Sequence, residues 1–453
     1  MSSAGVPGRA DLRNAAGTRE PRGGGGGMQG MERRHFLRVT GGLAGAALLT
    51  SCTGPGEDPP SPDPGRVAAG ASPPAGDVLY ADVSTHLSAV DAATGATILS
   101  LKDAVPGADQ RLLYSVTAAN ALITLDARTG RTLTRTSVPP GLVARAVAPS
   151  GTVVALAAPA PASPYGGPGR RETTVVVADP SGDRPPKTLR LKGNFEPDSF
   201  SLGGTALFVL EYLPATRPDR YRVRVCDLDS GTLGPLLTRE KKPVPPGAEE
   251  TMRGEGRVAV LAPDHRRLYT LYTHQPGHLH TRDLVAGRGT GVHAFVHVLD
   301  LEQRWAYCLD LPEPFGRGAA RGHALAVHGG ALFVYDAASG TVVRAGTDTL
   351  RIERTARIDA AGGTASAVAA GVRLYVAAGS SVQVVDGETL KAREEWRLPG
   401  TAAGIATGQD GVVYAGVPGT ALRFEARDGA GGRETSRTPI AGMTALRFAV
   451  PAV

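Results

Sequence analysis

The chain has 453 residues, of which 60 are Gly and 35 are Pro, and it carries a formal net charge of +6. This length is sufficient for a large core, and the Gly and Pro content is typical of turn-rich β structure. Residues 1–51 contain seven Arg against three acidic residues, so the rest of the chain carries only +2. A charge this small argues against a nucleic-acid-binding surface, and we expect no nucleic-acid partner.

A charged segment followed by an apolar run lies near the N-terminus. The apolar run covers residues 39–49, which is too short to span a bilayer stably, and Cys52 follows it. The charged segment contains a paired arginine and two apolar residues: Arg33, Arg34, Phe36 and Leu37.

This order of features resembles a twin-arginine export signal joined to the lipoprotein box of exported bacterial lipoproteins. The resemblance implies export, cleavage before Cys52 and attachment of diacylglycerol to the Cys52 thiol. It also implies a location on the outer face of the cytoplasmic membrane, with the lipid on Cys52 as the membrane contact. General secretion, or an amphipathic N-terminal helix with a chance cysteine, are the alternatives.

A Pro-rich and Gly-rich segment separates this signal from the rest of the chain. Residues 52–76 contain too little apolar surface to pack a core, and we expect them to act as a disordered tether. The sequence therefore divides into an extension and signal over residues 1–51, a linker over residues 52–76 and a folded domain over residues 77–453.

A turn motif recurs through the folded domain. Residues 90–95 read Val-Asp-Ala-Ala-Thr-Gly, and residues 125–130 read Leu-Asp-Ala-Arg-Thr-Gly. An Asp-initiated turn that Gly can complete at positive φ joins two strands of a hairpin. Repeated hairpins that cannot bury their apolar faces alone predict a β-propeller. Degenerate copies occur around Asp179, Asp227, Asp300, Asp348, Asp386 and Glu425.

The number of repeats predicts seven or eight four-stranded blades. We count eight units, but residues 106–111 leave little room for the first strand of the second unit, so seven blades remain open. Residues 443–450 alternate cleanly and have no blade after them. We expect this strand to complete the first blade beside residues 78–83 and so to close the ring. The units start near residues 78, 108, 142, 196, 254, 322, 365 and 402.

The repeats resemble the YVTN-type and quinoprotein-like β-propellers of exported bacterial proteins. That resemblance implies the fold more specifically than the function, because such propellers include binding proteins, scaffolds and enzymes. The Trp that usually follows the quinoprotein turn is missing, since Ile98, Leu99 and Leu133 occupy the relevant positions. An adjacent Cys pair is missing too. We therefore expect no quinone and no other cofactor.

The sequence favours a binding or scaffold module over an enzyme. It contains no Gly-x-Ser-x-Gly elbow and no His-Glu-x-x-His helix, and we assign no catalytic residue. The leading hypothesis is a monomer that binds a protein or a cell-envelope ligand. The alternative is a lactonase, lyase or quinone-dependent dehydrogenase with its site at the central channel. Four insertions form the expected recognition surface: residues 159–171, 214–220, 241–250 and 275–291.

Histidines concentrate in the fifth unit. His274, His278 and His280 have a spacing that a Gly-containing loop could direct at one metal ion, although a solvated loop is the simpler reading. His293 and His297 share a face of a strand but lie about 13 Å apart, which is too far for one metal. We therefore expect them to be packed strand residues.

Cys226 and Cys308 are the cysteines that remain once Cys52 carries lipid. An oxidising exterior would permit a disulfide between them. However, one precedes the turn of the fourth unit and the other lies on the outer strand of the fifth, so their Cα atoms need not approach within about 7 Å. Two buried thiols are the alternative.

Overall fold

The structure is a computed structural model that describes residues 74–452, except for residues 162, 166, 254–257, 290 and 426–431. Within that part of the chain, no helix combines the length and the apolar surface needed to cross a membrane. The linker up to residue 73 lies outside the described residues. The expected export and lipidation residues also lie outside them: Arg33, Arg34, Phe36, Leu37 and Cys52.

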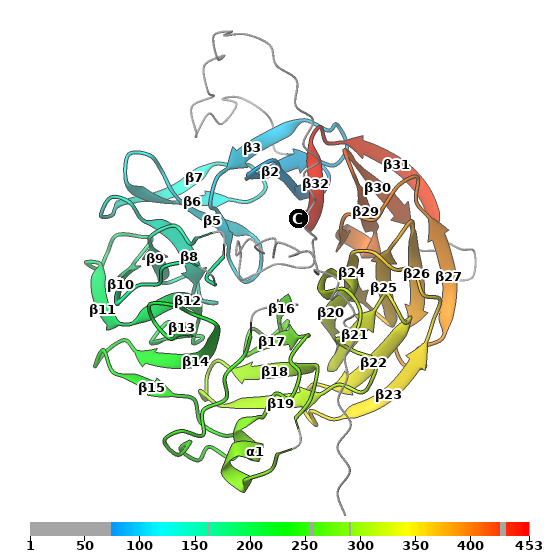
Figure 1. Ribbon diagram of the computed structural model, residues 1–453. Helices are drawn as coiled ribbons and strands as arrows, with labels where there is room; N and C mark the ends of the chain where they lie inside the picture. Colours follow the sequence, from blue (N-terminus) through cyan, green and yellow to red (C-terminus); the bar gives the residue numbers. More distant parts are fainter. Residues whose placement is uncertain are drawn as a thin grey trace, which may run out of the picture. The chain divides into compact units, whose positions relative to one another are not determined.

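Eight four-stranded antiparallel sheets form the blades of a β-propeller (Figure 1). The prediction of an all-β propeller is confirmed, and the structure has eight blades rather than seven. The second blade fits its first strand into only two residues, Val105–Pro106, which pair with Tyr114 and Leu113. A blade can therefore begin on a very short inner strand when the following hairpin is complete.

The strands of each blade are numbered along the chain from the inner edge outward, except in the first blade, where the last strand of the chain is innermost. The first blade contains β32 (Met443–Val450), β1 (Val78–Val83), β2 (His86–Asp91) and β3 (Thr97–Leu101). The second contains β4 (Val105–Pro106), β5 (Leu112–Val116), β6 (Ala121–Asp126) and β7 (Thr132–Ser137). The third contains β8 (Val143–Val147), β9 (Val154–Ala157), β10 (Glu172–Ala178) and β11 (Lys187–Lys192). The fourth contains β12 (Asn194–Phe200), β13 (Ala206–Leu213), β14 (Arg220–Asp227) and β15 (Leu233–Pro235).

The remaining blades follow the same order. The fifth contains β16 (Val258–Leu261), β17 (Arg267–Tyr272), β18 (Phe295–Asp300) and β19 (Ala306–Asp310). The sixth contains β20 (His323–His328), β21 (Ala331–Asp336), β22 (Thr341–Gly346) and β23 (Ile352–Arg357). The seventh contains β24 (Ala365–Ala370), β25 (Arg373–Ala378), β26 (Ser381–Asp386) and β27 (Ala392–Arg397). The eighth contains β28 (Ile405–Thr407), β29 (Val413–Val417), β30 (Thr420–Glu425) and β31 (Arg433–Pro439). The helices in the described part of the chain are α1 (Thr281–Ala286) and the 3-10 turns Ala320–Gly322 and Gln409–Gly411.

Six of the recurring Asp residues cap the turn between the third and fourth strands of a blade by accepting a hydrogen bond from a backbone N–H two or three residues later. In the first blade, Asp91 Oδ1 accepts hydrogen bonds from the backbone N–H groups of Ala93 at 2.8 Å and Thr94 at 2.9 Å. Gly95 completes the turn with a φ of +75°. Asp126 makes the equivalent bonds in the second blade. The motif therefore sets hairpin geometry, as expected from its sequence.

The C-terminal strand closes the ring as predicted. β32 pairs antiparallel with β1, and the register places Val450 beside Val78 and Met443 beside Val83. Tyr80 of β1 stacks on Phe448 of β32 with ring centroids 4.5 Å apart. The buried Arg447 forms an ion pair with Asp82. The last strand of the chain thereby supplies the fourth strand of the first blade and pairs the edge of β1 that would otherwise be open.

The hydrophobic core lies between the blades rather than within one of them. Among the described residues, each junction between neighbouring blades has a cluster of buried apolar side chains. A sheet face that would be exposed in a single blade is thereby covered by its neighbour, which is the main stabilising term of a propeller.

Candidate functional site

Two insertions meet at the junction between the fourth and fifth blades. The first connects β15 to β16, and the second connects β17 to β18. A bridge between Tyr221 and Met252 ties the first insertion to the fourth blade, and a bridge between Leu237 and Trp305 ties it to the fifth. Both insertions include segments that the sequence marked as recognition loops. The structure fixes them against the outer strands of two blades.

The second insertion contains the short helix α1, which the sequence did not predict. The chain first reverses at Gly277, with a φ of +70°, and His278 bridges to Val292. The backbone N–H of His280 then donates a hydrogen bond to Asp283 Oδ2 at 3.3 Å, across the first turn of α1. This boundary fixes the backbone of His280 where the helix begins.

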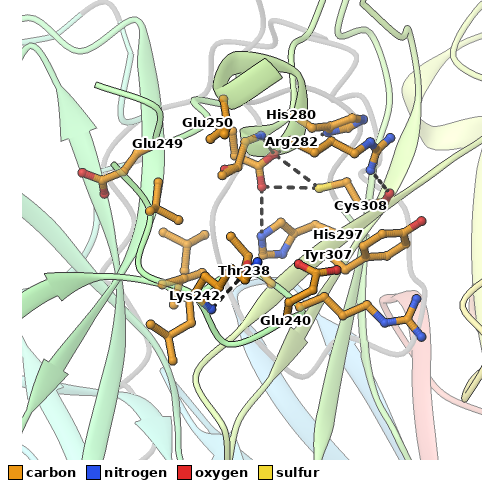
Figure 2. Close-up of a pocket in the computed structure, with 18 of the residues that line it drawn as sticks. Thr238, Glu240, Lys242, Glu249, Glu250, His280, Arg282, His297, Tyr307 and Cys308 are labelled. Atoms are coloured by element: carbon orange, nitrogen blue, oxygen red, sulfur yellow. Dashed lines mark hydrogen bonds and ion pairs between the residues drawn. The ribbon is translucent and has the colours of Figure 1, made fainter. Parts of the chain in front are cut away.

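The two insertions and the outer strands enclose a cavity of about 340 Å³ (Figure 2). Apolar side chains from both blades and both insertions line part of it: Val223, Leu236, Val244, Met252 and Val285. Polar side chains with greater exposure line another part: Arg239, Glu240, Lys242 and Arg282. Its most buried ionisable groups are Glu250, His280, His297 and Cys308.

Glu250 is the centre of the buried group, with its side chain 11% exposed. His280 Nδ1 lies 3.4 Å from Glu250 Oε2, and His278 Nε2 lies 3.7 Å from the same oxygen. On the other side, His297 Nε2 lies 3.5 Å from Oε1. The Cys308 thiol donates a hydrogen bond to Oε1 at 3.4 Å. One carboxylate is thus surrounded by three imidazoles and a thiol.

The neighbouring Glu249 has a different environment. Its Oε1 lies 3.0 Å from Arg222 Nη1, and its Oε2 lies 3.6 Å from Arg224 Nε. Glu211 on β13 pairs with the same two arginines at 2.6 Å and 3.4 Å. Glu249 therefore belongs to a cluster of ion pairs on the fourth blade, whereas Glu250 belongs to the buried group in the cavity.

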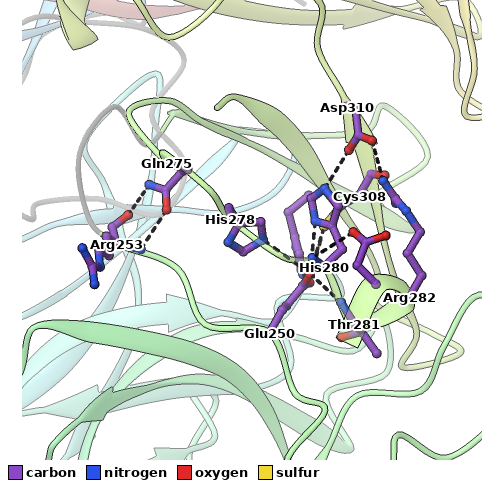
Figure 3. Close-up of polar contacts among 11 residues, drawn as sticks. Glu250, Arg253, Gln275, His278, His280, Thr281, Arg282, Cys308 and Asp310 are labelled. Carbon is purple, nitrogen blue, oxygen red and sulfur yellow. Dashed lines mark hydrogen bonds and ion pairs between the residues drawn. The ribbon is translucent and has the colours of Figure 1, made fainter. Parts of the chain in front are cut away.

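Asp310 contacts the ring nitrogen of His280 that faces away from Glu250, and Arg282 in turn binds Asp310 (Figure 3). His280 Nε2 lies 2.7 Å from Asp310 Oδ1, and Arg282 donates to Asp310 Oδ2 at 2.6 Å. Arg282 also donates to the carbonyl oxygen of Cys308 at 2.6 Å. An ionised carboxylate can only accept, so the Nε2–H of His280 is the donor and its Nδ1 faces Glu250.

The electrostatics of the cluster follow from this packing. Burial raises the pKa of Glu250, but the contacts and charges of His278, His280 and His297 outweigh burial and leave it well below its usual range. Burial lowers the pKa of His280, but Asp310 and Glu250 raise it above its ordinary value. Burial and the Glu250 carboxylate raise the pKa of the Cys308 thiol well above its ordinary value.

Two buried nitrogen atoms in the cluster have no hydrogen-bond partner. These are His278 Nε2 and His280 Nδ1, and both lie next to the Glu250 carboxylate. Buried polar atoms are usually hydrogen-bonded, so an unsatisfied pair at one carboxylate is unusual. The donor types that converge here are a carboxylate, an imidazole and a thiol, with Glu250, His280 and Cys308 atoms all within 4.8 Å of one another.

The structure brings together two of the three histidines that the sequence proposed as metal ligands. The rings of His278 and His280 are 4.8 Å apart. His274 lies in a different group, with its ring 6.3 Å from that of His293 and 6.4 Å from that of His323. The chain reverses at Gly277, between His274 and the other two histidines, and metal binding by the three together stays a prediction.

The proposed disulfide between Cys226 and Cys308 is not formed, because both cysteines are free and buried. Cys226 packs in the cluster between the third and fourth blades. Cys308 packs in the cluster between the fourth and fifth blades. The fourth-blade sheet therefore separates the two thiols, and the alternative of two buried thiols is the one observed.

Sequence reasoning missed Glu250, Cys308 and Asp310 as partners of the histidines, and took His297 for a packed strand residue only. A partial signal was present in the fifth blade. The Asp300 turn sets the β18–β19 register, which places His297 opposite Cys308. Cys308 and Asp310 are two residues apart in β19 and so share a face. No comparable local rule brings Glu250 to this face.

No family model and no curated protein sequence matches the chain. Among solved structures, the chain is similar to dihydro-heme d1 dehydrogenase NirN, at 15% identity over 86% of this chain and 77% of that chain, with a TM-score of 0.46. It is also similar to BamB from Moraxella catarrhalis, at 15% identity over 74% of this chain and 87% of that chain, with a TM-score of 0.38. Similarity at this level concerns the fold and transfers no activity or partner.

The position of the cluster also bears on the enzyme alternative. His297 and Cys308 lie on β18 and β19, the two outer strands of the fifth blade, and Glu250 and His280 lie on the insertions. The described cluster is thus at the outer part of a blade junction, whereas the alternative placed a catalytic site at the central channel.

Proposed function

We propose that the chain is an exported, lipid-anchored β-propeller that acts as a binding module for a protein of the cell envelope. The partner binds at the cavity between the fourth and fifth blades. The observation that carries this proposal is the cavity itself. Two insertions that are not needed to complete a four-stranded blade fold together there and surround a buried carboxylate.

The chemistry of the cavity supports a protein segment as the ligand. Its volume of about 340 Å³ is at the lower end of the usual range for ligand pockets and suits one large side chain. Val285 on α1 leaves an apolar side chain 56% exposed at its edge. The guanidinium groups of Arg239 and Arg282 lie 5.1 Å and 5.5 Å from the Tyr307 ring centroid.

The charged residues that line the cavity predict which kind of residue stands next to the apolar side chain in the partner. Three cations, Arg239, Lys242 and Arg282, line the cavity against the one exposed acid Glu240. An apolar side chain with an adjacent carboxylate would fill the cavity and pair with Lys242. The partner therefore presents an apolar residue flanked by an acidic one.

The anchor is supported by the sequence alone. Arg33, Arg34, Phe36, Leu37 and Cys52 form the export and lipidation pattern, and residues 52–76 have the composition of a tether. A lipid on Cys52 would keep the propeller at the outer face of the cytoplasmic membrane. We expect Cys52→Ser to move the exported chain from the membrane to the soluble fraction, while Cys226→Ser stays with the membrane. Membrane retention of Cys52→Ser would remove the lipid anchor from the proposal.

A photo-crosslinking residue at position 285 tests the binding site in intact cells. Position 372 is the control, because Val372 is also an exposed valine, at 77%, but lies in the seventh blade. We expect one envelope protein to be captured from position 285 and not from position 372, and Lys242→Glu to weaken its binding in purified form. Capture that is equal at both positions, or binding that is unchanged by Lys242→Glu, would contradict this site.

A further inference from the structure

We propose that Glu250, His280 and Cys308 form a metal site that selects zinc, with a fourth coordination position open to the cavity. This inference goes beyond the proposed function, because zinc binding needs no partner protein. The two can also fail separately: zinc binding is measured on the purified chain, and partner capture is measured in cells.

The distances already approach those of a tetrahedral site. With zinc bonds of about 2.0–2.3 Å, the ligand atoms of such a site lie about 3.3–3.8 Å apart. His280 Nδ1 is 3.4 Å from Glu250 Oε2, and Cys308 Sγ is 3.5 Å from the same oxygen. The three ligand atoms all lie within 4.8 Å of one another. The distance between the ligand atoms of His280 and Cys308 is therefore at most 4.8 Å, and it would shorten by no more than about 1 Å when zinc binds.

The outer contacts of His280 match those of a metal ligand. A metal-binding histidine usually donates its second ring N–H to a carboxylate, which fixes the tautomer. Asp310 accepts this bond from Nε2 at 2.7 Å, and Arg282 fixes Asp310 in turn. The remaining nitrogen, Nδ1, has no hydrogen-bond partner, and His280 is only 2% exposed. This nitrogen therefore faces Glu250 and lies within 4.8 Å of the Cys308 thiol.

A divalent cation fits between these two groups. His280 Nδ1 and Glu250 Oε2 lie 3.4 Å apart, and the nitrogen has no hydrogen-bond partner in this arrangement. A cation bonded to both atoms would satisfy the buried nitrogen and the carboxylate together. The thiolate of Cys308 and the carboxylate of Glu250 together supply two negative charges, which balance the charge of Zn²⁺.

The donor set also selects the metal. A thiolate and an imidazole are softer ligands than the oxygens that Mg²⁺ and Ca²⁺ require, and with one carboxylate they suit tetrahedral Zn²⁺. All three residues line the cavity, which gives the ion an entry path and leaves room for a fourth ligand. His278 and His297 stand at the same carboxylate, at 3.7 Å and 3.5 Å.

Cobalt titration of the purified, metal-free full chain tests this site, with Cys52→Ser as the background. We expect one Co²⁺ per chain, a thiolate-to-cobalt charge-transfer band, and displacement of Co²⁺ by one equivalent of Zn²⁺. Cys308→Ser should abolish the band, whereas Cys226→Ser, which changes the other buried thiol, should keep it. No bound cobalt, or a band that survives in Cys308→Ser, would overturn the proposal.

Two further comparisons of zinc affinity test the site even if Cys308→Ser does not fold. His280→Gln should lose tight zinc binding, and His274→Gln, which alters a histidine of the same insertion outside the cluster, should not. Asp310→Asn retains all three ligands and removes only the charge behind His280, so zinc affinity should fall about 10–100-fold. Equal affinity in His280→Gln and His274→Gln would overturn the zinc site. Unchanged affinity in Asp310→Asn would contradict the role of Asp310 in orienting His280.

Discussion

The closing blade and the junction between the fourth and fifth blades use similar strands for different purposes. At the closing blade, β1 and β32 pair along their length, and Tyr80 stacks on Phe448. At the other junction, apolar packing continues, but the insertions add Glu250 and His280 to the buried Cys308. The first region holds the ring together, and the second contains groups that the ring does not need. This difference is the reason that we propose the junction as the binding region.

Of the changes that test this comparison, removal of β32 should reduce the stability of the propeller most. A chain that ends at Gly442 leaves β1 without its inner partner and exposes one side of the first blade. We expect loss of cooperative thermal unfolding, measured by circular dichroism and by resistance to proteolysis. A truncated chain that unfolds as cooperatively as the full chain would show that closure is dispensable.

Tyr80→Ala should be the most destabilising point change at the closing blade. Tyr80 is fully buried, stacks on Phe448 and donates its hydroxyl to the Ala127 carbonyl of the second blade. Truncation of a buried aromatic side chain costs about 3–5 kcal/mol. Tyr80→Phe keeps the ring and should cost only about 1 kcal/mol. Denaturant unfolding of the two variants separates packing from the hydrogen bond, and similar losses would contradict the packing role.

Glu250→Gln should have a smaller but still large effect on the free energy of unfolding, measured in the presence of a chelator. It removes the buried carboxylate that contacts His278, His280, His297 and the Cys308 thiol, which costs about 3 kcal/mol. Glu249→Gln is the matched control and should cost about 1 kcal/mol, because Arg222 keeps Glu211 at 2.6 Å. Equal costs for the two glutamates would mean that the cavity cluster is not electrostatically distinct.

Asp386→Ala should have the smallest effect, because it removes one turn cap. Asp386 Oδ1 accepts from the Thr389 N–H and hydroxyl, both at 2.7 Å, and Arg393 donates to Oδ2 at 2.8 Å. By analogy with helix caps, the loss should be about 1 kcal/mol near neutral pH. The exposed Asp229→Ala is the control and should be nearly neutral.

The pH dependence of that loss has a definite sign. Hydrogen bonds from Thr389 and the Arg393 guanidinium lower the pKa of Asp386 below its ordinary value. The contribution of Asp386 to stability is therefore fully present above the unfolded pKa of about 3.9 and is lost as the pH falls toward the lower folded pKa. The difference between Asp386→Ala and the unchanged chain should shrink below pH 4. A constant difference down to about pH 2 would contradict this electrostatic role.

The contrast between the two regions also explains what the sequence could predict. The Asp126 turn and the strand over residues 443–450 depend on local rules of turn chemistry and alternation, and the structure has both. The cavity depends on where two insertions fold. His274 and His280 are six residues apart, yet the reversal at Gly277 places them in different clusters, and Glu250 reaches His280 only through the tertiary fold. Spacing alone could not distinguish these outcomes.

The most direct measurement is anomalous X-ray scattering at the zinc edge from crystals of the full chain grown with Zn²⁺. If the junction is a metal-containing binding site, the anomalous map has a peak within about 2.0–2.3 Å of His280 Nδ1, Cys308 Sγ and a Glu250 oxygen. A map with no peak at these three residues, from crystals that contain zinc in solution, would contradict the assignment and leave the cluster as an ion-pair network.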